Sequence, residues 1–155
     1  MKNRFLIFLL PGMFALSFLC SCEKSAERRA EIDDEKIREY LEKKNISAIR
    51  DDSGLYYVIE ADGFGDHREI TSYVTVSYTG LLMEDEKVFD GSSSTRFLLS
   101  GLIRAWQIGI PKIGIGGIIH LYAPSGLAYG SVARQNIPAN SNLVFEIKLI
   151  DIYNP

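Results

Sequence analysis

Hydrophobic and polar residues alternate along much of the chain after Gly54, a period of two that is typical of β-strands with one buried face. The alternation predicts strands over residues 55–60, 72–80, 118–123 and 143–152. In the last segment Phe145 and Ile147 share one face, whereas Glu146 and Lys148 share the other. Gly, Ser, Asn and Asp gather between the segments, where they predict turns.

Two other segments have helical spacing. Residues 102–108 predict a short apolar helix that Gly109 is expected to end. An amphipathic helix is predicted near residues 33–44, with Asp33 or Asp34 as its cap. This N-terminal helix would serve either as a dimerisation arm or as a helix packed beside the domain or a solvated stalk. Together the elements predict an α+β fold in which a curved antiparallel β-sheet wraps around one short helix, preceded by an N-terminal helix.

The first residues differ from the rest of the chain. Lys2 and Arg4 precede an apolar run over residues 5–19, and small residues follow it. This layout predicts a secretory signal peptide over residues 1–21. The run is short for a membrane span, because crossing the hydrocarbon takes about 20 apolar residues. An uncleaved N-terminal anchor is the alternative interpretation.

The apolar run ends in a Leu-Cys-Ser-Cys stretch closed by Cys22, which resembles a bacterial lipobox. The resemblance implies a lipoprotein that begins at Cys22 and carries acyl chains such as palmitate. Residues 22–50 would then form a lipidated tether and the amphipathic helix, and residues 51–155 the folded domain. We expect this product in the cell envelope, anchored to the outer membrane and facing the periplasm. Both cysteines fall in this stretch, so the exported chain is expected to have no disulfide and no thiol nucleophile.

Composition excludes several classes of function. The chain has 17 Lys and Arg against 20 Asp and Glu, and its net charge of −3 argues against nucleic-acid binding. The two histidines, His67 and His120, are isolated in the sequence, and we expect neither to act in catalysis. No phosphate-binding loop, zinc motif or nucleophile elbow is present, and residues 114–117 are expected to form a turn. We therefore expect no metal and no cofactor.

Aromatic side chains are the chemistry that remains, since the chain has eight Tyr, eight Phe and one Trp. Rotation about an X-Pro bond is a reaction that needs only an apolar, aromatic cleft. Its barrier of about 18–20 kcal/mol arises from amide resonance, which the twisted transition state has lost. A pocket that excludes water favours the twisted, less dipolar amide over the planar one. No proton donor or nucleophile is required.

Five short motifs, in the right order, resemble those of FKBP-type peptidyl-prolyl cis-trans isomerases. They are VTVSYTG at 74–80, VFDGSS at 88–93, LIRAW at 102–106, LAYG at 127–130 and IPANSNLVF at 137–145. Two positions depart from the family pattern, with Ala105 where Gly is usual and Ala139 in place of a second Pro. The resemblance covers about residues 54–152, and it implies the FKBP-like fold and isomerase activity.

The resemblance also implies a proline pocket. Tyr78, Asp90 and Tyr129 would be catalytic, with Asp90 orienting Tyr78 or accepting a polar contact and the Tyr129 hydroxyl bonding a substrate carbonyl. Trp106 would form the pocket floor beneath the proline ring, and the Ile103 backbone N–H would face the ligand. The substrate-binding set would be Phe89, Phe97, Leu102, Ile103, Trp106, Ile137 and Phe145.

The segment between Asp90 and Trp106 is shorter than the family pattern. Family members usually carry two phenylalanines here, one residue apart, whereas this chain has Phe97 and Thr95. We expect a more open pocket wall at this point. The loop over residues 131–136 is expected to tune the choice of substrate.

The resemblance implies that Pro-containing polypeptides are the substrates, that exported proteins are assisted in folding, and that FKBP-type macrolides could inhibit. The signal peptide and N-terminal helix also resemble lipoprotein members associated with gliding motility in some bacteria. The alternative is a non-catalytic chaperone or assembly factor that binds Pro-containing segments without isomerising them.

Overall fold

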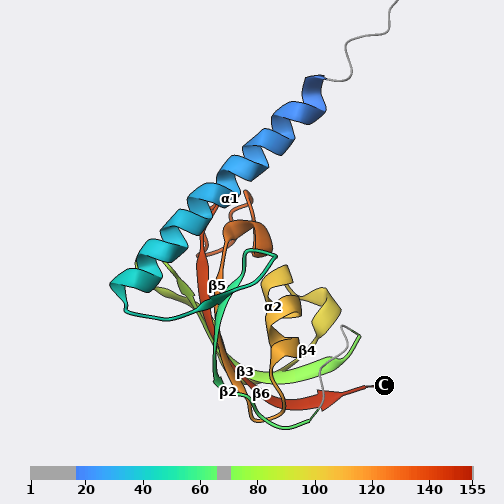
Figure 1. Ribbon diagram of the computed structural model, residues 1–155. Coiled ribbons are helices and arrows are strands. Elements are labelled where there is room, and N and C mark those ends of the chain that lie inside the picture. Colours follow the sequence, from blue (N-terminus) through green and yellow to red (C-terminus); the bar gives the residue numbers. More distant parts are fainter. Residues whose placement is uncertain (1–16, 66–70, 155) are drawn as a thin grey trace, which may run out of the picture.

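The computed structural model describes residues 17–65 and 71–154. Six strands form one antiparallel sheet in the order β1-β2-β5-β6-β3-β4, and its long strands curve around a short helix (Figure 1). The strands are β1 (Ile49–Arg50), β2 (Tyr56–Ala61), β3 (Tyr73–Leu82), β4 (Val88–Leu98), β5 (Ile118–Ala123) and β6 (Leu143–Tyr153). The predicted α+β class, with a curved antiparallel sheet around a short helix, is confirmed.

All four strands predicted from alternation are present, and two further strands were not predicted. β4 was missed because its centre is a run of Gly, Ser and Thr without alternation. It is held as a strand by pairing along β3, from Tyr73 opposite Leu98 to Leu81 opposite Val88. β1 has only two residues and pairs with β2, so the sheet starts just before residue 51.

The concave face of the sheet carries the main hydrophobic core. Val74, Val76, Ile147 and Leu149 are completely buried in it, on the faces that alternation assigned to the interior. Residues Tyr57 and Ile59 of β2 also pack against this core, as their spacing predicted. Intervening residues therefore face the opposite side of the sheet.

The short helix covers the concave face, and its start differs from the prediction. Helix α2 spans Arg104–Gly109, between the single 3₁₀ turns Leu99–Gly101 and Ile110–Lys112. Leu102 and Ile103 precede the helix and are both extended, and Ile103 is the N-cap of α2. Gly109 does not end the helical path, since its backbone is right-handed and a 3₁₀ turn follows. Its missing side chain instead lets α2 approach β5, because a Cβ there would lie 2.5 Å from Leu121 Cδ2.

The N-terminal helix is much longer than predicted. Helix α1 spans Ser17–Lys43 and ends in a Schellman motif, in which Ile46 N–H donates to Leu41 and Asn45, at φ +54°, reverses the chain. The prediction that Asp33 or Asp34 caps its start is wrong, as is the separate tether before it. Residues 23–32 contain no Gly or Pro and are rich in Glu, Arg and Ala, so nothing interrupts the helix there.

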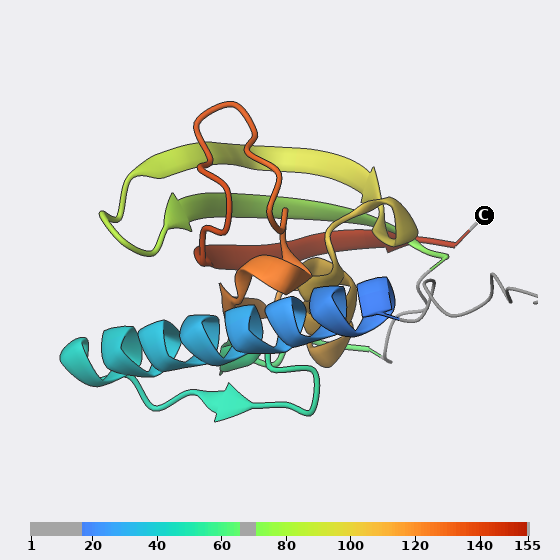
Figure 2. The same ribbon diagram turned by 90° about the horizontal axis from the view of Figure 1, so that it is seen from above.

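The two ends of α1 have different surroundings. Its C-terminal half lies on the convex face of the sheet, where Ile37 and Leu41 pack with Tyr56, Tyr122 and Val144. Its N-terminal half extends past the sheet, as Figure 1 shows. Figure 2, the view from above, shows α1 lying along one side of the sheet. No described helix is both long enough and apolar enough to cross a membrane. The predicted signal peptide, except for its last five residues, lies outside the described residues, as do His67 and the side chain of Cys22.

Candidate functional site

A cluster of aromatic rings fills the space between α2 and the sheet. The Trp106 indole, only 4% exposed, contacts Tyr78, Phe145 and Phe97 edge-on, with ring centroids 5.0, 5.5 and 6.0 Å away. Phe89 extends the cluster by an edge-on contact with Phe145 at 5.8 Å. The structure thus brings together five aromatic residues of the predicted pocket from β3, β4, α2 and β6.

A hollow of about 440 Å³ opens beside this cluster. Its walls are Phe89, Asp90, Tyr129, Arg134, Gln135, Asn136 and Ile137. Four of these residues were predicted as site residues. Trp106, which was expected to form the floor, does not line the hollow directly. It joins the walls through Tyr78, which bonds Asp90, and through Phe145, which contacts Phe89.

Asp90 organises the polar side of the hollow. The Tyr78 hydroxyl donates to Asp90 Oδ2 at 2.8 Å, and the Gly91 N–H donates to Oδ1 at 2.8 Å. Asp90 therefore orients Tyr78, as one of its two expected roles requires. Burial, and then the hydrogen bond to the Asp90 carboxylate, raise the pKa of Tyr78 to about 12. The phenol is thus neutral at any physiological pH and remains a donor.

The raised pKa of Tyr78 gives a pH-dependent prediction. A tyrosine in the unfolded chain ionises at about pH 10. The contribution of neutral Tyr78 to the free energy of unfolding is therefore fully present below about pH 10, and it is lost as the pH rises through about 12. Asp90→Asn removes the carboxylate charge that acts on Tyr78, so we expect the pKa of Tyr78 to fall towards about 10, while burial, the largest cause, keeps it raised. Spectrophotometric titration of both proteins measures the shift. An unchanged pKa would show that Asp90 does not act on this hydroxyl.

Tyr129 lies on the opposite side of the hollow, in the loop that follows β5. Burial, with a smaller contribution from the Asp90 charge, raises its pKa, so it also stays protonated. The Arg134 guanidinium lies 6.0 Å from the centre of its ring. No described residue accepts a hydrogen bond from the Tyr129 hydroxyl, which leaves the donor available to a ligand.

The segment before α2 packs against the main core. Leu102 and Ile103 are half-buried against the core, and no described residue accepts a hydrogen bond from the Ile103 N–H. The Gln107 side chain holds this segment in place, because its Nε2 donates to the Leu102 carbonyl at 2.7 Å. Gln107 was not singled out from the sequence, since an amide on a short helix carries no distinctive motif.

The segment of β4 that was predicted to form a pocket wall carries Phe97 and Thr95. Phe97 pairs with Val74 and Thr95 with Val76, so both side chains are on the face that carries the core. The Thr95 hydroxyl donates to Ser92 Oγ at 2.7 Å.

Three residues of the hollow were not predicted individually: Arg134, Gln135 and Asn136. They form a tight turn in which the backbones of Arg134 and Ile137 exchange two hydrogen bonds, at 2.9 and 3.0 Å. Asn136 adopts φ +65°, which asparagine tolerates better than most residues. The Gln-Asn pair before Ile137 was the signal in the sequence for this turn.

A second hollow of about 500 Å³ lies between α1, the β3–β4 turn and residues 138–142. Although it is larger, much of its wall is charged, including Lys36, Glu39, Glu84 and Asp85, and the ring cluster does not reach it. The smaller hollow is therefore the candidate site, because Phe89 of the ring cluster forms part of its wall.

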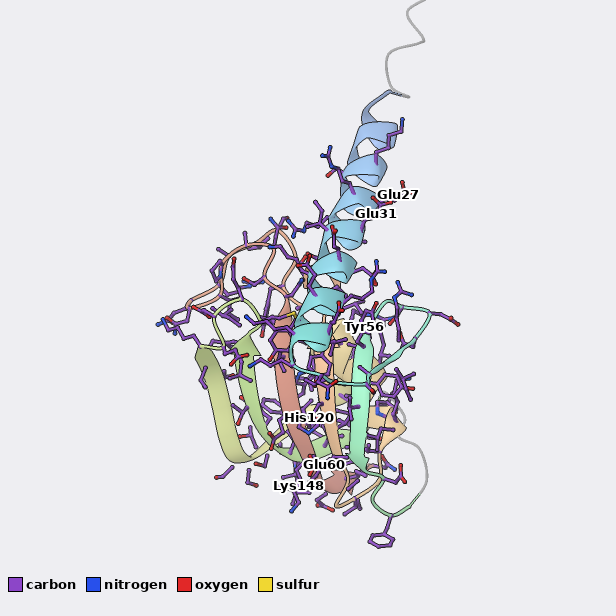
Figure 3. All side chains as sticks on the ribbon, turned by 60° about the vertical axis from the view of Figure 1, so that its left-hand side comes forward. Glu27, Glu31, Tyr56, Glu60, His120 and Lys148 are labelled. Atoms are coloured by element: carbon purple, nitrogen blue, oxygen red, sulfur yellow. The ribbon has the colours of Figure 1, made fainter. Side chains whose placement is uncertain are left out.

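Other chemistry is sparse in the described part of the chain. His120 pairs with Glu60 at 2.8 Å, and Lys148 lies near this pair (Figure 3). Ile119 and Leu121, on either side of His120, are buried in the core, so His120 points to the opposite, convex face of the sheet. Among the described residues no three His, Cys, Asp or Glu side chains are placed to hold a metal ion.

Comparison with known proteins identifies the relatives of this chain. A family described as FKBP-type peptidyl-prolyl cis-trans isomerase matches residues 66–150. FkpA of Escherichia coli strain K12, named as an isomerase of this type, is 36% identical over 138 residues, which cover 85% of this chain and 51% of that protein. A probable isomerase of Haemophilus influenzae is 35% identical, over 85% of this chain and 56% of its own. The chain thus spans about half the length of these curated relatives.

Solved structures agree with this comparison. The crystal structure of E. coli FkpA matches with a TM-score of 0.70 and 34% identity, covering 86% of this chain and 65% of that one. A peptidyl-prolyl cis-trans isomerase of Pseudomonas syringae matches with a TM-score of 0.69 and 27% identity, covering 81% and 96%. The matched family segment contains the whole ring cluster and every residue that lines the smaller hollow.

Proposed function

This chain belongs to the family of FKBP-type peptidyl-prolyl cis-trans isomerases, and on that basis we propose that it isomerises X-Pro bonds in exported polypeptides and so assists their folding. The observation that carries the proposal is the hollow beside the ring cluster, with the neutral Tyr129 phenol in its wall and the Tyr78 phenol held behind it by Asp90. Apolar walls at Phe89 and Ile137 would exclude water from the prolyl amide and favour its twisted form.

The polar groups of the hollow would orient the substrate. The Tyr129 hydroxyl would donate to a carbonyl next to the proline, and the Ile103 N–H would bind a carbonyl on the other side. Asp90 would hold Tyr78 in position and keep its phenol protonated. None of these groups transfers a proton, since rotation of the amide breaks no covalent bond.

The test is a proline isomerisation assay on the purified full-length chain. We expect acceleration of cis-trans exchange in a Pro-containing peptide, and competition by an FKBP-type macrolide. Tyr129→Phe should lower kcat/KM by up to about tenfold, because it removes one neutral hydrogen bond to substrate. A chain that binds the peptide but exchanges it at the rate of buffer would support the alternative, a non-catalytic chaperone or assembly factor.

We also propose that the chain is a lipoprotein, cleaved after residue 21, acylated at Cys22 and held on the outer membrane facing the periplasm. The Leu-Cys-Ser-Cys stretch and the apolar run before it support this proposal. Anchoring by several acyl chains would place the isomerase where exported chains arrive unfolded. Metabolic labelling with tagged palmitate should mark the protein and fail to mark Cys22→Ser. Equal labelling of both proteins would contradict acylation at this residue.

A further inference from the structure

A buried carboxylate joins α1 to the loops of the hollow. Asp33 is 1% exposed although it lies on a helix surface, at the point where α1 meets the domain. Its Oδ1 accepts two hydrogen bonds from Arg29, from Nε at 3.0 Å and Nη2 at 2.7 Å. A buried charge destabilises the fold unless it is fully paired. The loss of any hydrogen-bond donor to the Asp33 carboxylate is therefore expected to be costly.

The other partner of Asp33 is Ser125, which lies 92 positions further along the chain. Asp33 Oδ2 accepts from the Ser125 N–H at 3.0 Å and from its Oγ at 2.5 Å. Ser125 is itself 1% exposed and begins the 3₁₀ turn Ser125–Leu127. That turn has no side-chain cap of its own, and the carboxylate from α1 binds the N–H at its start.

Ser125 in turn closes the loop that carries Tyr129. Its carbonyl accepts from the Ala128 N–H at 3.0 Å and from the Gly130 N–H at 2.8 Å. These two residues flank Tyr129 on either side, and Gly130, at φ +61°, reverses the chain. A shift of Ser125 would therefore move the backbone on both sides of Tyr129.

Asn142 extends the same network to the opposite wall of the hollow. Its side-chain oxygen accepts from the Ser125 N–H at 3.1 Å, and its Nδ2 donates to the Asp33 carbonyl at 3.3 Å. Asn142 ends the segment that begins at Ile137, and the Asn140 N–H in that segment donates to the Gly130 carbonyl at 2.8 Å. The segment that carries Tyr129 and the segment over residues 137–142 are thus both hydrogen-bonded to Asp33, the first through Ser125 and the second through Asn142.

We propose that Asp33 is a positioning residue of the isomerase site, which sets the place of the Tyr129 hydroxyl through Ser125. The inference rests on the proposed function, and it makes the C-terminal half of α1 a part of the site. Asp33 touches no substrate in this proposal, and its effect passes only through the hydrogen bonds of Ser125, Ala128 and Gly130.

The test is a double-mutant cycle on the full-length chain. Asp33→Ala should lower kcat/KM by about tenfold, because small displacements of a binding group have large effects on rate. Added to Tyr129→Phe, the same change should lower kcat/KM by only about twofold or less, since residues that act as a unit are not additive. Ser125→Ala, which removes one of the two bonds to Oδ2, should give a smaller loss that Tyr129→Phe also masks.

Asp34→Ala is the matched control. Asp34 neighbours Asp33 and also ties α1 to the domain, through Arg50 at 2.8 Å and Tyr56 at 2.9 Å, but it has no bond to the loop. It should loosen α1 and leave kcat/KM unchanged. If Asp34→Ala and Asp33→Ala lower kcat/KM equally, or if Asp33→Ala and Tyr129→Phe multiply in full, Asp33 has only a structural role and the inference is wrong.

The parent chain separates this inference from the proposed function. If the parent isomerises the peptide and the cycle is additive, only the role of Asp33 fails. If the parent binds the peptide without isomerising it, the proposed activity fails, and the same cycle measured on peptide affinity decides the role of Asp33. A parent that neither binds nor isomerises Pro-containing peptides would overturn both.

Discussion

Replacing Trp106 by alanine is expected to lower the free energy of unfolding by about 3–5 kcal/mol and to abolish isomerisation. The indole is 4% exposed, and it makes the three edge-on contacts that join α2 to β3, β4 and β6. Each such ring pair contributes about 0.5–1.5 kcal/mol beyond the area it buries. Its removal leaves Tyr78 and Phe145 without support beneath the walls of the hollow. Chemical denaturation and the isomerisation assay measure the two losses.

Trp106→Phe separates packing from the polar group of the indole. No described residue accepts a hydrogen bond from the buried indole N–H, and an unpaired buried donor costs about 1–3 kcal/mol. Phenylalanine removes that donor and keeps a ring, so its loss of stability should be well below that of alanine. Tyr153→Ala, which removes a half-exposed aromatic residue of β6, is the control. Equal losses of stability and of isomerisation in Trp106→Ala and Tyr153→Ala would contradict the proposed role of the indole in supporting the walls of the hollow.

The strands could be predicted where burial is one-sided. In β3 and β6 the sequence alternates because one face meets the core and the other does not, and both were found within two residues of their ends. The sequence of β4 does not alternate in this way, since its middle is Gly, Ser and Thr. Pairing with β3 is what makes this segment a strand. The length of α1 was underestimated because its exposed N-terminal half has no apolar stripe, although its helix propensity is high.

The site was predictable only as far as motifs reach. Tyr78, Asp90 and Phe89 lie in local motifs of two adjacent strands, and the register of β3 with β4 brings them together. Asp33 belongs to no motif, and its spacing favoured a helix cap. Its burial depends on Ser125 and Asn142, which are 92 and 109 positions away. Contacts at such separation follow from the tertiary fold and leave no periodic signal in the sequence.

Replacing Gly80 by alanine is expected to lower kcat/KM by about 10- to 100-fold with a loss of only about 1–3 kcal/mol in stability. Gly80 faces the core, and a Cβ there would lie 2.7 Å from Phe89 Cζ and 3.1 Å from Phe145 Cε1. These atoms are at the far ends of rings, so the rings can move and the fold survives. Phe89 is a wall of the hollow, however, and its displacement changes the space in which the proline ring would lie.

A second-site change distinguishes this mechanism from general destabilisation. Phe89→Leu removes the nearest ring atoms that the new methyl group would meet and leaves only Phe145 Cε1 at 3.1 Å. Gly80→Ala should therefore cost less stability when leucine is at position 89 than when phenylalanine is there. Gly101→Ala is the matched control, because a Cβ there meets nothing within 4 Å. Denaturation and isomerisation assays on the parent protein and these four variants give the comparison. If Gly80→Ala costs the same activity with either residue at position 89, the glycine is not there to make room for the phenylalanine ring.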